Sequence, residues 1–350
     1  MEETPDPITH GTTTAETQVP EYFRAPLKNS SPPKIDVPPV VDTVDVVDIN
    51  EVSPAERLKY FQPLIEAALT KCEQVVQEMK EAHERGETFD GGKIFDARSE
   101  LYELAMKMCG YEARKSDLLA MHDLIRPQRG EVSVDLSAGT GFLTQAVEYW
   151  TGARTYAVDP SEIQLQHLVQ NCGDQVTAVH AAPNETDKIF ADGNIPHEGV
   201  DVVTSFGGWH HVDKEKLPEA MQNVADMLKP KGRFVVGDVG AETPLQRHFD
   251  EIVTDKCLTG HEMGQFMSPE KLKELAESAG LELVSAEMKP LTWDFNSEEE
   301  MAWFFKGLHA YPQPVEEIIQ DLRDTLGVKE EDGKFKLNWP MLFWEIRKPE

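Results

Sequence analysis

The sequence has few cysteines, few basic residues and no long apolar run. Its four cysteines, Cys72, Cys109, Cys172 and Cys257, are widely scattered and show no spacing typical of metal ligands. We therefore expect free thiols in a reducing compartment, and no metal site. No stretch of about 18 apolar residues occurs, so we expect no membrane span and no membrane partner.

Lysine and arginine together number 34 against 63 acidic residues, which gives a formal net charge of −29. Nucleic-acid binding needs clustered basic side chains along the phosphate backbone, and the sequence has no such cluster. We therefore expect no nucleic-acid partner. The first residues, Met-Glu-Glu, lack the basic start and apolar core of a secretory signal, so we expect a cytoplasmic protein.

Residues 1–50 are rich in proline, threonine, aspartate and valine and are nearly free of aromatic residues. This composition predicts a disordered or extended acidic arm. Residues 35–48 alternate apolar and acidic side chains, so an added edge strand, or a strap onto a partner subunit, is the alternative to disorder.

Residues 51–128 are expected to be helical. Ser53 and Glu56 form a capping box around Pro54, which stands at the first helical position. Apolar residues then recur at helical spacing, at Leu58, Phe61, Ile65, Ala68, Cys72, Val75 and Met79. Gly86 ends this helix, and the glycines at 91–92 lead into two more helices, at 99–108 and 116–125. The apolar face serves either homodimerisation or a cap over the active site, and both roles stay open.

The most informative segment is 132–141. A short apolar run ends at Asp135 and Leu136, a turn containing Gly139 and Gly141 follows, and a helix is expected from Phe142. A strand, a glycine-rich turn and a helix bring the backbone of an α/β sheet against a nucleotide-like ligand, because glycine has no Cβ. A second apolar run, 155–158, ends at Asp159, whose carboxylate can accept hydrogen bonds from ribose hydroxyls.

Two ligands fit this layout, a dinucleotide and S-adenosylmethionine. The dinucleotide fingerprint Gly-x-Gly-x-x-Gly fails, because its third glycine would be Thr144. Asp135 would repel a pyrophosphate but can meet the amino group of a methionine-like moiety. The segment resembles motif I of class I S-adenosylmethionine-dependent methyltransferases, usually Asp-x-Gly-x-Gly-x-Gly, with Ser137 in place of the first glycine.

The resemblance extends along about two-thirds of the chain. The further matches to the family's strands and loops are 156–161, 201–212, 227–238, 281–287 and 339–346. It implies an α/β fold: a doubly wound, seven-stranded, mostly parallel sheet whose last strand is antiparallel, with a helical N-terminal addition. Residues 129–350 would form the methyltransferase domain, and residues 291–338, with helices near 298 and at 315–326, a lid-like insertion.

The resemblance also implies a set of cofactor-binding residues. They are Asp135, Ser137, Gly139, Thr140, Gly141, Asp159, Pro160, Ala182, Asn184, Ser205, Phe206 and Gly207. The acidic residue that often follows the family's third strand is missing. We therefore expect the adenine to be recognised by the backbone, by Asn184 or by Glu185.

The implied chemistry needs little from the protein, because the sulfonium methyl group is already electrophilic. A hydroxyl or ammonium acceptor must lose a proton, and a positioned histidine is the usual base. His210 and His211 follow the fourth predicted strand and are the candidate catalytic residues, with a structural role as the alternative. The candidate acceptor-binding residues are Trp209, His248, His261, Trp293 and Trp303. Trp209 could also stack on adenine, and the aromatics of the insertion could equally be buried against the sheet.

These features predict S-adenosylmethionine-dependent methyl transfer to a small molecule, with the acceptor atom (oxygen, nitrogen, sulfur or carbon) left open. Two alternatives remain: a non-catalytic protein of the same fold with a regulatory or assembly role, and a methyltransferase that modifies proteins.

Overall fold

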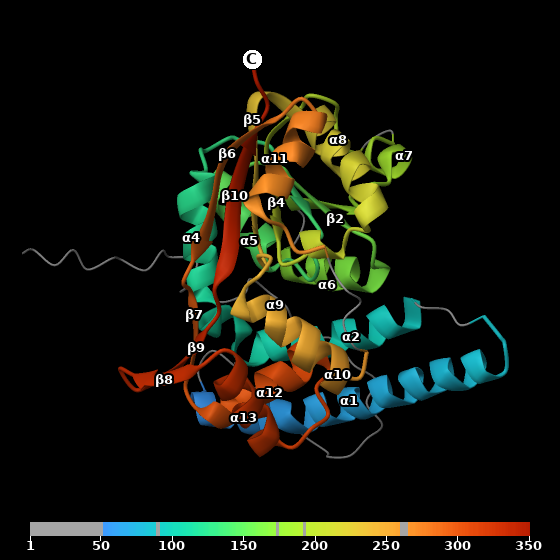
Figure 1. Cartoon of the computed structure of the whole chain (residues 1–350), viewed down its shortest axis with the longest axis vertical. Helices are drawn as coiled ribbons and strands as arrows, with labels where there is room; N and C mark the ends of the chain where they lie inside the picture. Colours follow the sequence, from blue (N-terminus) through green and yellow to red (C-terminus); the bar gives the residue numbers. More distant parts are fainter. Residues whose placement is uncertain (1–51, 89–91, 173–174, 192–193, 260–264) are drawn as a thin grey trace, which may run out of the picture.

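The computed structural model describes residues 52–88, 92–172, 175–191, 194–259 and 265–350 (Figure 1). The predicted N-terminal arm and His261 lie outside these ranges. Among the described helices, none combines the length and the apolar character that a bilayer crossing requires.

The centre of the protein is a seven-stranded sheet in the order β3-β2-β1-β4-β5-β10-β6. Its strands are β1 (Ser133–Leu136), β2 (Thr155–Asp159), β3 (Val176–His180), β4 (Val200–Phe206), β5 (Leu228–Asp238), β6 (Glu282–Lys289) and β10 (Met341–Arg347). Neighbouring strands are parallel except that β10 runs antiparallel to both β5 and β6. The predicted fold class is confirmed, including the antiparallel last strand.

The central strands β1, β2, β4 and β5 are buried on both faces, because helices cover both sides of the sheet and successive side chains of a strand point to opposite sides. Val203 and Phe234 pack in the core under helices α8 and α11, whereas Val202 and Val235 pack in the core under α4 and α5. This double burial explains why β1, β2 and the last part of β5 have mostly apolar sequences, whereas the edge strand β6 alternates exposed and partly buried residues.

The longer helices flank the sheet or lie below it. Their bounds are α1 (Pro54–Glu84), α2 (Gly92–Ala105), α4 (Lys115–Ile125), α5 (Phe142–Thr151), α6 (Glu162–Cys172), α8 (Leu217–Met227), α11 (Pro269–Ser278), α12 (Glu298–His309) and α13 (Val315–Thr325). The short helices are α3 (Tyr111–Ala113), α7 (Thr186–Ile189), α9 (Pro244–His248) and α10 (Thr254–Lys256), with single turns at Met106–Gly110, Trp209–His211, Lys214–Lys216 and Phe249–Val253.

Helices α1, α2 and α12 pack against one another and form a layer across the carboxyl ends of the parallel strands (Figure 1). The capping box that starts α1 forms as the sequence predicts, with the Glu56 amide donating to Ser53 Oγ and the Ser53 amide to Glu56 Oε2. Helix α2 starts at Gly92, seven residues before the predicted 99, so the predicted start is corrected; Gly91 lies outside the described residues. The apolar side of this layer joins the core on one face of the sheet.

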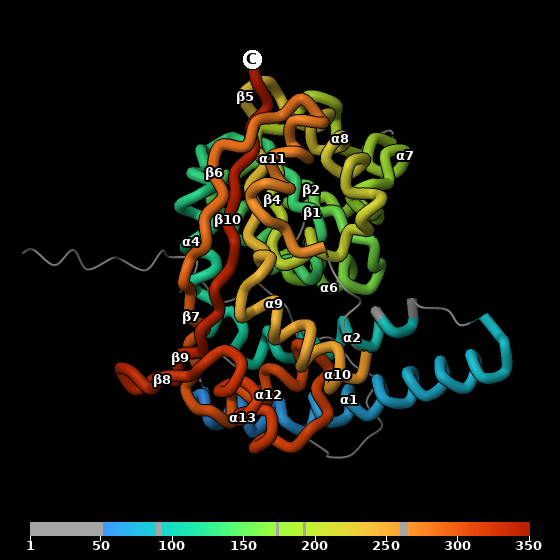
Figure 2. Tube along the Cα trace, in the orientation of Figure 1, coloured from blue at the N-terminus to red at the C-terminus, as the bar shows by residue number. Residues whose placement is uncertain are grey.

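After β6 the chain leaves the sheet and returns as β10 (Figure 2). The excursion holds the two expected helices, α12 and α13, and a small sheet that was not predicted. That sheet has the order β7-β9-β8, from β7 (Thr292–Phe295), β8 (Val328–Glu331) and β9 (Lys334–Asn338). Strands β7 and β9 alternate polar and apolar residues, but over only four or five positions, and β8 carries mostly charged residues. Such short runs are weak signals for a strand.

Gly307 sets the spacing between α12 and α2. A Cβ at this position would lie 2.6 Å from the Ala105 Cβ and 2.7 Å from the Leu101 carbonyl oxygen. The absence of a side chain therefore lets the two helices approach closely, and these are the helices that cover the cavity described below.

We expect Gly307→Ala to lower the free energy of unfolding by about 1–3 kcal/mol, because the added methyl group forces the packed helices apart. Urea unfolding monitored by circular dichroism measures this change. Helix propensity alone predicts the opposite, a gain of about 1 kcal/mol. A more stable variant would therefore contradict the close packing.

Candidate active site

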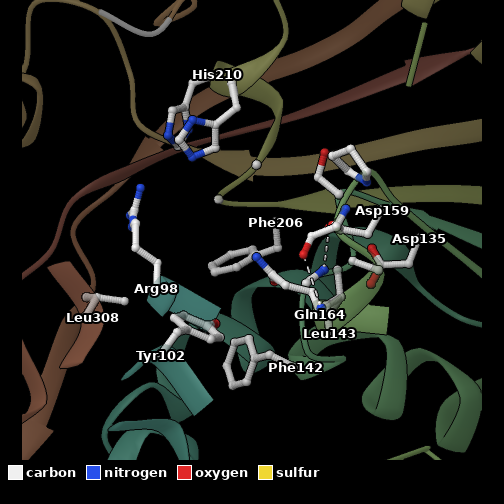
Figure 3. Close-up of a pocket in the computed structure, with 18 of the residues that line it drawn as sticks. Arg98, Tyr102, Asp135, Phe142, Leu143, Asp159, Gln164, Phe206, His210 and Leu308 are labelled. Atoms are coloured by element: carbon white, nitrogen blue, oxygen red, sulfur yellow. Dashed lines mark hydrogen bonds between the residues drawn. The ribbon is translucent and has the colours of Figure 1, made fainter. Parts of the chain in front are cut away.

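A cavity of about 670 Å³ lies between the sheet and the helical layer. Its walls come from the ends of β1, β2 and β4, the turn before α5, and helices α2 and α12 (Figure 3). Ligand pockets for small molecules have volumes of about 300–1,000 Å³ and favour this position, the carboxyl edge of a parallel sheet where the strand order reverses.

The turn after β1 forms one wall of the cavity. Ser137 and Gly139 both have φ +56°, and Gly141 has φ +96°. Serine thus adopts the left-handed conformation at the position where the family has glycine, at a cost of roughly 1–2 kcal/mol. A Cβ on Gly139 would lie 2.9 Å from Gln164 Oε1, so glycine keeps this side of the cavity open.

The predicted residues of this turn fall into two groups. Ser137 and Gly139 line the cavity. Thr140 and Gly141 lie behind it: Thr140 is buried, and a Cβ on Gly141 would meet Cys172 Sγ at 2.8 Å. These two residues shape the turn and do not face the cavity.

Asp159 links the ends of β1 and β2. Its Oδ2 accepts a hydrogen bond from the Gly139 amide at 2.9 Å, and its Oδ1 accepts one from the Ser161 amide at 2.8 Å. The side chain is almost completely buried yet lines the cavity, and burial raises the pKa of its carboxyl above the ordinary value. Each oxygen keeps a further lone pair that can accept a ligand hydroxyl.

Asp135 lies deeper at the end of β1. Its carboxyl accepts hydrogen bonds from Thr144 Oγ1 at 2.7 Å and Thr204 Oγ1 at 2.8 Å. Burial raises its pKa to about 7, despite these two hydrogen bonds, which favour the charged form. A cationic ligand group nearby would draw the carboxyl toward its ionised form.

The wall beyond Asp159 includes Pro160, Ser161, Gln164 and His180. Of these residues only Pro160 was predicted. Gln164 could have been found from its position, because it lies in the first turn of the helix that follows Asp159. The predicted Ala182 and Asn184 are partly buried in the loop after β3 and do not line the cavity. Glu185 accepts the Ala182 amide at 2.8 Å, which fixes this loop.

Three predicted residues lie at the end of β4. Phe206 and Gly207 line the cavity, whereas Ser205 is buried within the sheet and does not. The following turn carries His210 and His211, and both line the cavity. His210 is nearly buried and is labelled in Figure 3; His211 is exposed.

His210 pairs with Asp238, the last residue of β5. The distance from His210 Nδ1 to Asp238 Oδ1 is 2.6 Å, and Asp238 Oδ2 accepts the His210 amide at 3.0 Å. Because an ionised carboxylate only accepts, Nδ1 carries the hydrogen and Nε2 is the ring nitrogen with the lone pair. Asp238 was not among the predicted site residues. The sequence feature that could have identified Asp238 is its position as an acidic residue at the carboxyl end of β5, the strand next to β4.

The predicted acceptor-binding residues separate in the structure. Trp293 lines the cavity and donates its indole N–H to the Asp117 carboxylate at 3.0 Å. Trp209 does not: it is completely buried and packs edge-on against Phe234 beneath the sheet. It therefore cannot stack on a ligand in this cavity.

His248 and Trp303 also lie away from the cavity. His248 is completely buried, its Nδ1 lies 3.0 Å from Thr325 Oγ1, and burial lowers its pKa to about 4. Trp303 packs in the core with the Lys306 ammonium over its ring. On α12 it is the last turn, with Leu308 and His309, that reaches the cavity.

Helix α2 contributes Asp96, Arg98 and Tyr102 to the cavity wall, and Arg114 joins them from the turn between α3 and α4. None of them was predicted, because an amphipathic helix seen in sequence alone does not reveal what its polar side chains face. The Arg114 guanidinium lies 4.3 Å from the centre of the Phe142 ring and pairs with Asp117 at 3.0 Å.

The raised pKa of Asp135 predicts a pH-dependent stability. Between about pH 4 and 7 the unfolded chain ionises this carboxyl while the folded protein keeps its proton, so the free energy of unfolding falls as the pH rises. In Asp135→Asn this loss is absent. Relative to wild type, the variant should gain up to about 4 kcal/mol between pH 4 and 8, at about 1.4 kcal/mol per pKa unit.

Urea unfolding at a series of pH values measures this difference. Asp187→Asn, at an exposed position of α7, is the matched control and should parallel the wild type. Parallel curves for Asp135→Asn would contradict the assignment.

Comparison with known proteins gives one family. Residues 111–286, about half of the chain, match the family model described as "Methyltransferase domain". Two curated relatives, each named an uncharacterized methyltransferase, come from Geobacillus sp. (strain WCH70) and Geobacillus thermodenitrificans (strain NG80-2). Each is 24% identical over 149 residues, covering 41% of this chain and 65% of the relative. The chain thus spans less than two thirds of their length.

Among solved structures, the YcgJ protein of Bacillus subtilis has a TM-score of 0.48 and 18% identity, covering 67% of this chain and 99% of that chain. Phosphoethanolamine N-methyltransferase 2 of Haemonchus contortus has a TM-score of 0.49 and 16% identity, covering 74% of this chain and 58% of its own. The family match, together with the order of the strands and the glycine turn beside Asp159, establishes that the chain belongs to the class I S-adenosylmethionine-dependent methyltransferases.

Proposed function

We propose that the protein transfers the methyl group of S-adenosylmethionine to a small-molecule acceptor that loses a proton, a hydroxyl or an amine. One observation carries this proposal: a single cavity joins the Gly139–Asp159 turn to the His210–Asp238 pair. The Gly139–Asp159 turn can bind the nucleoside and the amino-acid tail of the cofactor. The His210–Asp238 pair can remove a proton from the acceptor.

The residues present fit the cofactor. Asp159 offers two carboxylate oxygens, held in place by backbone amides, for the ribose hydroxyls. The Ser137–Gly139 turn leaves room where a Cβ would collide, and the raised pKa of Asp135 marks a carboxyl that an ammonium group would stabilise in ionised form. When bound, S-adenosylmethionine supplies an electrophilic methyl group on its sulfonium.

His210 has the features of a general base. Asp238 holds both the His210 ring and its backbone amide, so the imidazole is fixed in one tautomer with Nε2 as the proton acceptor. Because Asp238 Oδ1 also accepts the Val239 amide at 2.7 Å, the carboxylate itself is fixed. In this arrangement His210 accepts the proton that the acceptor loses, and Asp238 orients it.

The cavity wall supports a small acceptor rather than a protein tail. Helices α2 and α12 cover the carboxyl edge of the sheet, and aromatic side chains form part of the cavity wall. The aromatic side chains are Tyr102, Phe142, Phe206, Phe249, Trp293 and Trp339. We therefore assign the 291–338 insertion, which supplies Trp293 and the end of α12, the role of a lid.

The cofactor proposal predicts that wild-type protein binds S-adenosylhomocysteine and that Asp159→Ala binds it about 10- to 100-fold more weakly, because charge-assisted hydrogen bonds to the ribose are lost. Isothermal titration calorimetry measures the affinities. Asp187→Ala, which removes an exposed carboxylate of α7, is the control. Absence of wild-type binding, or an undiminished affinity of Asp159→Ala, would refute the cofactor assignment.

The base proposal predicts that His210→Gln lowers kcat by about 10²- to 10⁴-fold while S-adenosylhomocysteine affinity is retained. Transfer of a radiolabelled methyl group to a pooled set of phenols, alcohols and amines provides the assay. Asp238→Asn should lower kcat and change the pH profile of kcat/KM, a readout that a loss of stability alone would not produce. His211→Gln is the matched control. Full activity of His210→Gln would exclude this histidine as the base.

A further inference from the structure

Arg98 lines the cavity from helix α2 and is only partly buried. Figure 3 shows its side chain extending from the helix toward His210. Within the part of the chain that the structure describes, its guanidinium makes no hydrogen bond and no ion pair. Burial lowers its pKa, and the ionisable groups that act on it are the thiols of Cys72 and Cys257, not carboxylates.

This situation differs from that of the other arginine in the cavity. Arg114 is held by Asp117 at 3.0 Å and by the Tyr102 hydroxyl at 3.1 Å, and it packs over Phe142. Its charge is already compensated, so its role is to hold the wall together. Arg98 is a cation whose compensating charge the described residues do not supply.

The carboxylates of the cavity lie elsewhere. Asp135, Asp159 and Glu162 come from β1, β2 and the start of α6, the side assigned to the cofactor. Figure 3 shows Asp135 and Asp159 across the cavity from Arg98. Asp96 shares helix α2 with Arg98, but residues two apart on a helix do not face each other.

We propose that the acceptor is an anion, a carboxylate or a phosphate monoester, whose charged group binds Arg98. This inference rests on the proposed function. The planar guanidinium presents forked N–H donors that match the paired oxygens of either group, and charge-assisted hydrogen bonds in a partly buried site are strong. A bound anion provides the missing counter-charge.

The other side chains that line the cavity indicate the chemical character of the acceptor's uncharged part. Figure 3 shows Tyr102, Phe206 and Leu308 on the same side of the cavity as Arg98, and Phe249 and Trp293 also line this cavity. An apolar or aromatic body therefore fits between the anion and the atom that receives the methyl group. Because the formal net charge of −29 repels anions at long range, a cation within the cavity is the local feature that can select one.

The test uses matched probes on full-length protein saturated with S-adenosylhomocysteine. The probes are 3-phenylpropionate, its neutral amide 3-phenylpropanamide, and 2-phenylethyl phosphate, with affinities measured by calorimetry. We expect wild type to bind at least one anion about 10- to 100-fold more tightly than the amide. The preference between the two anions distinguishes a carboxylate acceptor from a phosphate acceptor.

Arg98→Gln should abolish the preference for the anion and leave the S-adenosylhomocysteine affinity unchanged, whereas Arg98→Lys should retain part of it. Arg85→Gln removes the same charge from an exposed arginine beyond the end of α1 and should change neither affinity. Circular dichroism checks that the variants are folded.

Three results would overturn the proposal: equal wild-type affinity for amide and anions, no wild-type binding of either anion, or an anion preference that survives in Arg98→Gln. The first two need no variant, so a folding defect does not obscure the outcome. If S-adenosylhomocysteine itself fails to bind, the proposed function fails, and the anion preference is then measured on the protein alone.

Discussion

The hydrogen bond from the Gly139 amide to the Asp159 carboxylate is the interaction on which the site depends. It ties the turn after β1 to the end of β2, two elements that are adjacent in the sheet but twenty residues apart in the chain. Because Asp159 also accepts the Ser161 amide, one buried side chain fixes the shape of both loops. Its carboxyl is held partly desolvated, which strengthens any further hydrogen bond that it accepts. The positive φ angles of Ser137, Gly139 and Gly141 occur in the turn that this hydrogen bond holds.

The His210–Asp238 pair lies at the ends of two other neighbouring strands of the same sheet. The carboxyl ends of β4 and β5 bring His210 and Asp238 together, since parallel neighbouring strands end at the same edge of the sheet. Across the gap, α2 and α12 supply Arg98, Tyr102 and His309. The groups that we propose to be catalytic thus come from the sheet edge, whereas the groups that we expect to select the acceptor come mainly from the helical layer. With this separation, the proposed acceptor-binding residues could differ without any change in the residues that we propose to hold the cofactor.

Much of this arrangement could be predicted from the sequence, because apolar runs that end in Asp135, Asp159 and Phe206 are local signals for strands. The pairing of His210 with Asp238 could not, since 28 positions separate them and only the sheet order makes them neighbours. Arg98 was missed because a helix pattern shows which side chains are buried but not that a polar one faces a cavity. Trp209 was predicted to face the acceptor because it precedes two histidines that line the cavity. In the structure it lies in a tight turn that directs its side chain into the core.

The core on one face of the sheet continues without interruption into α1, α2 and α12. Swinging the helical layer away as a rigid body would expose that shared interior, at about 25 cal/mol for each Å² of apolar surface. For the proposed function, we therefore expect exchange of product for substrate to proceed by local rearrangement at the rim of the cavity, where the 291–338 insertion supplies Trp293 and the last turn of α12. For the same reason the covering helices and the sheet should melt together, as one cooperative unit.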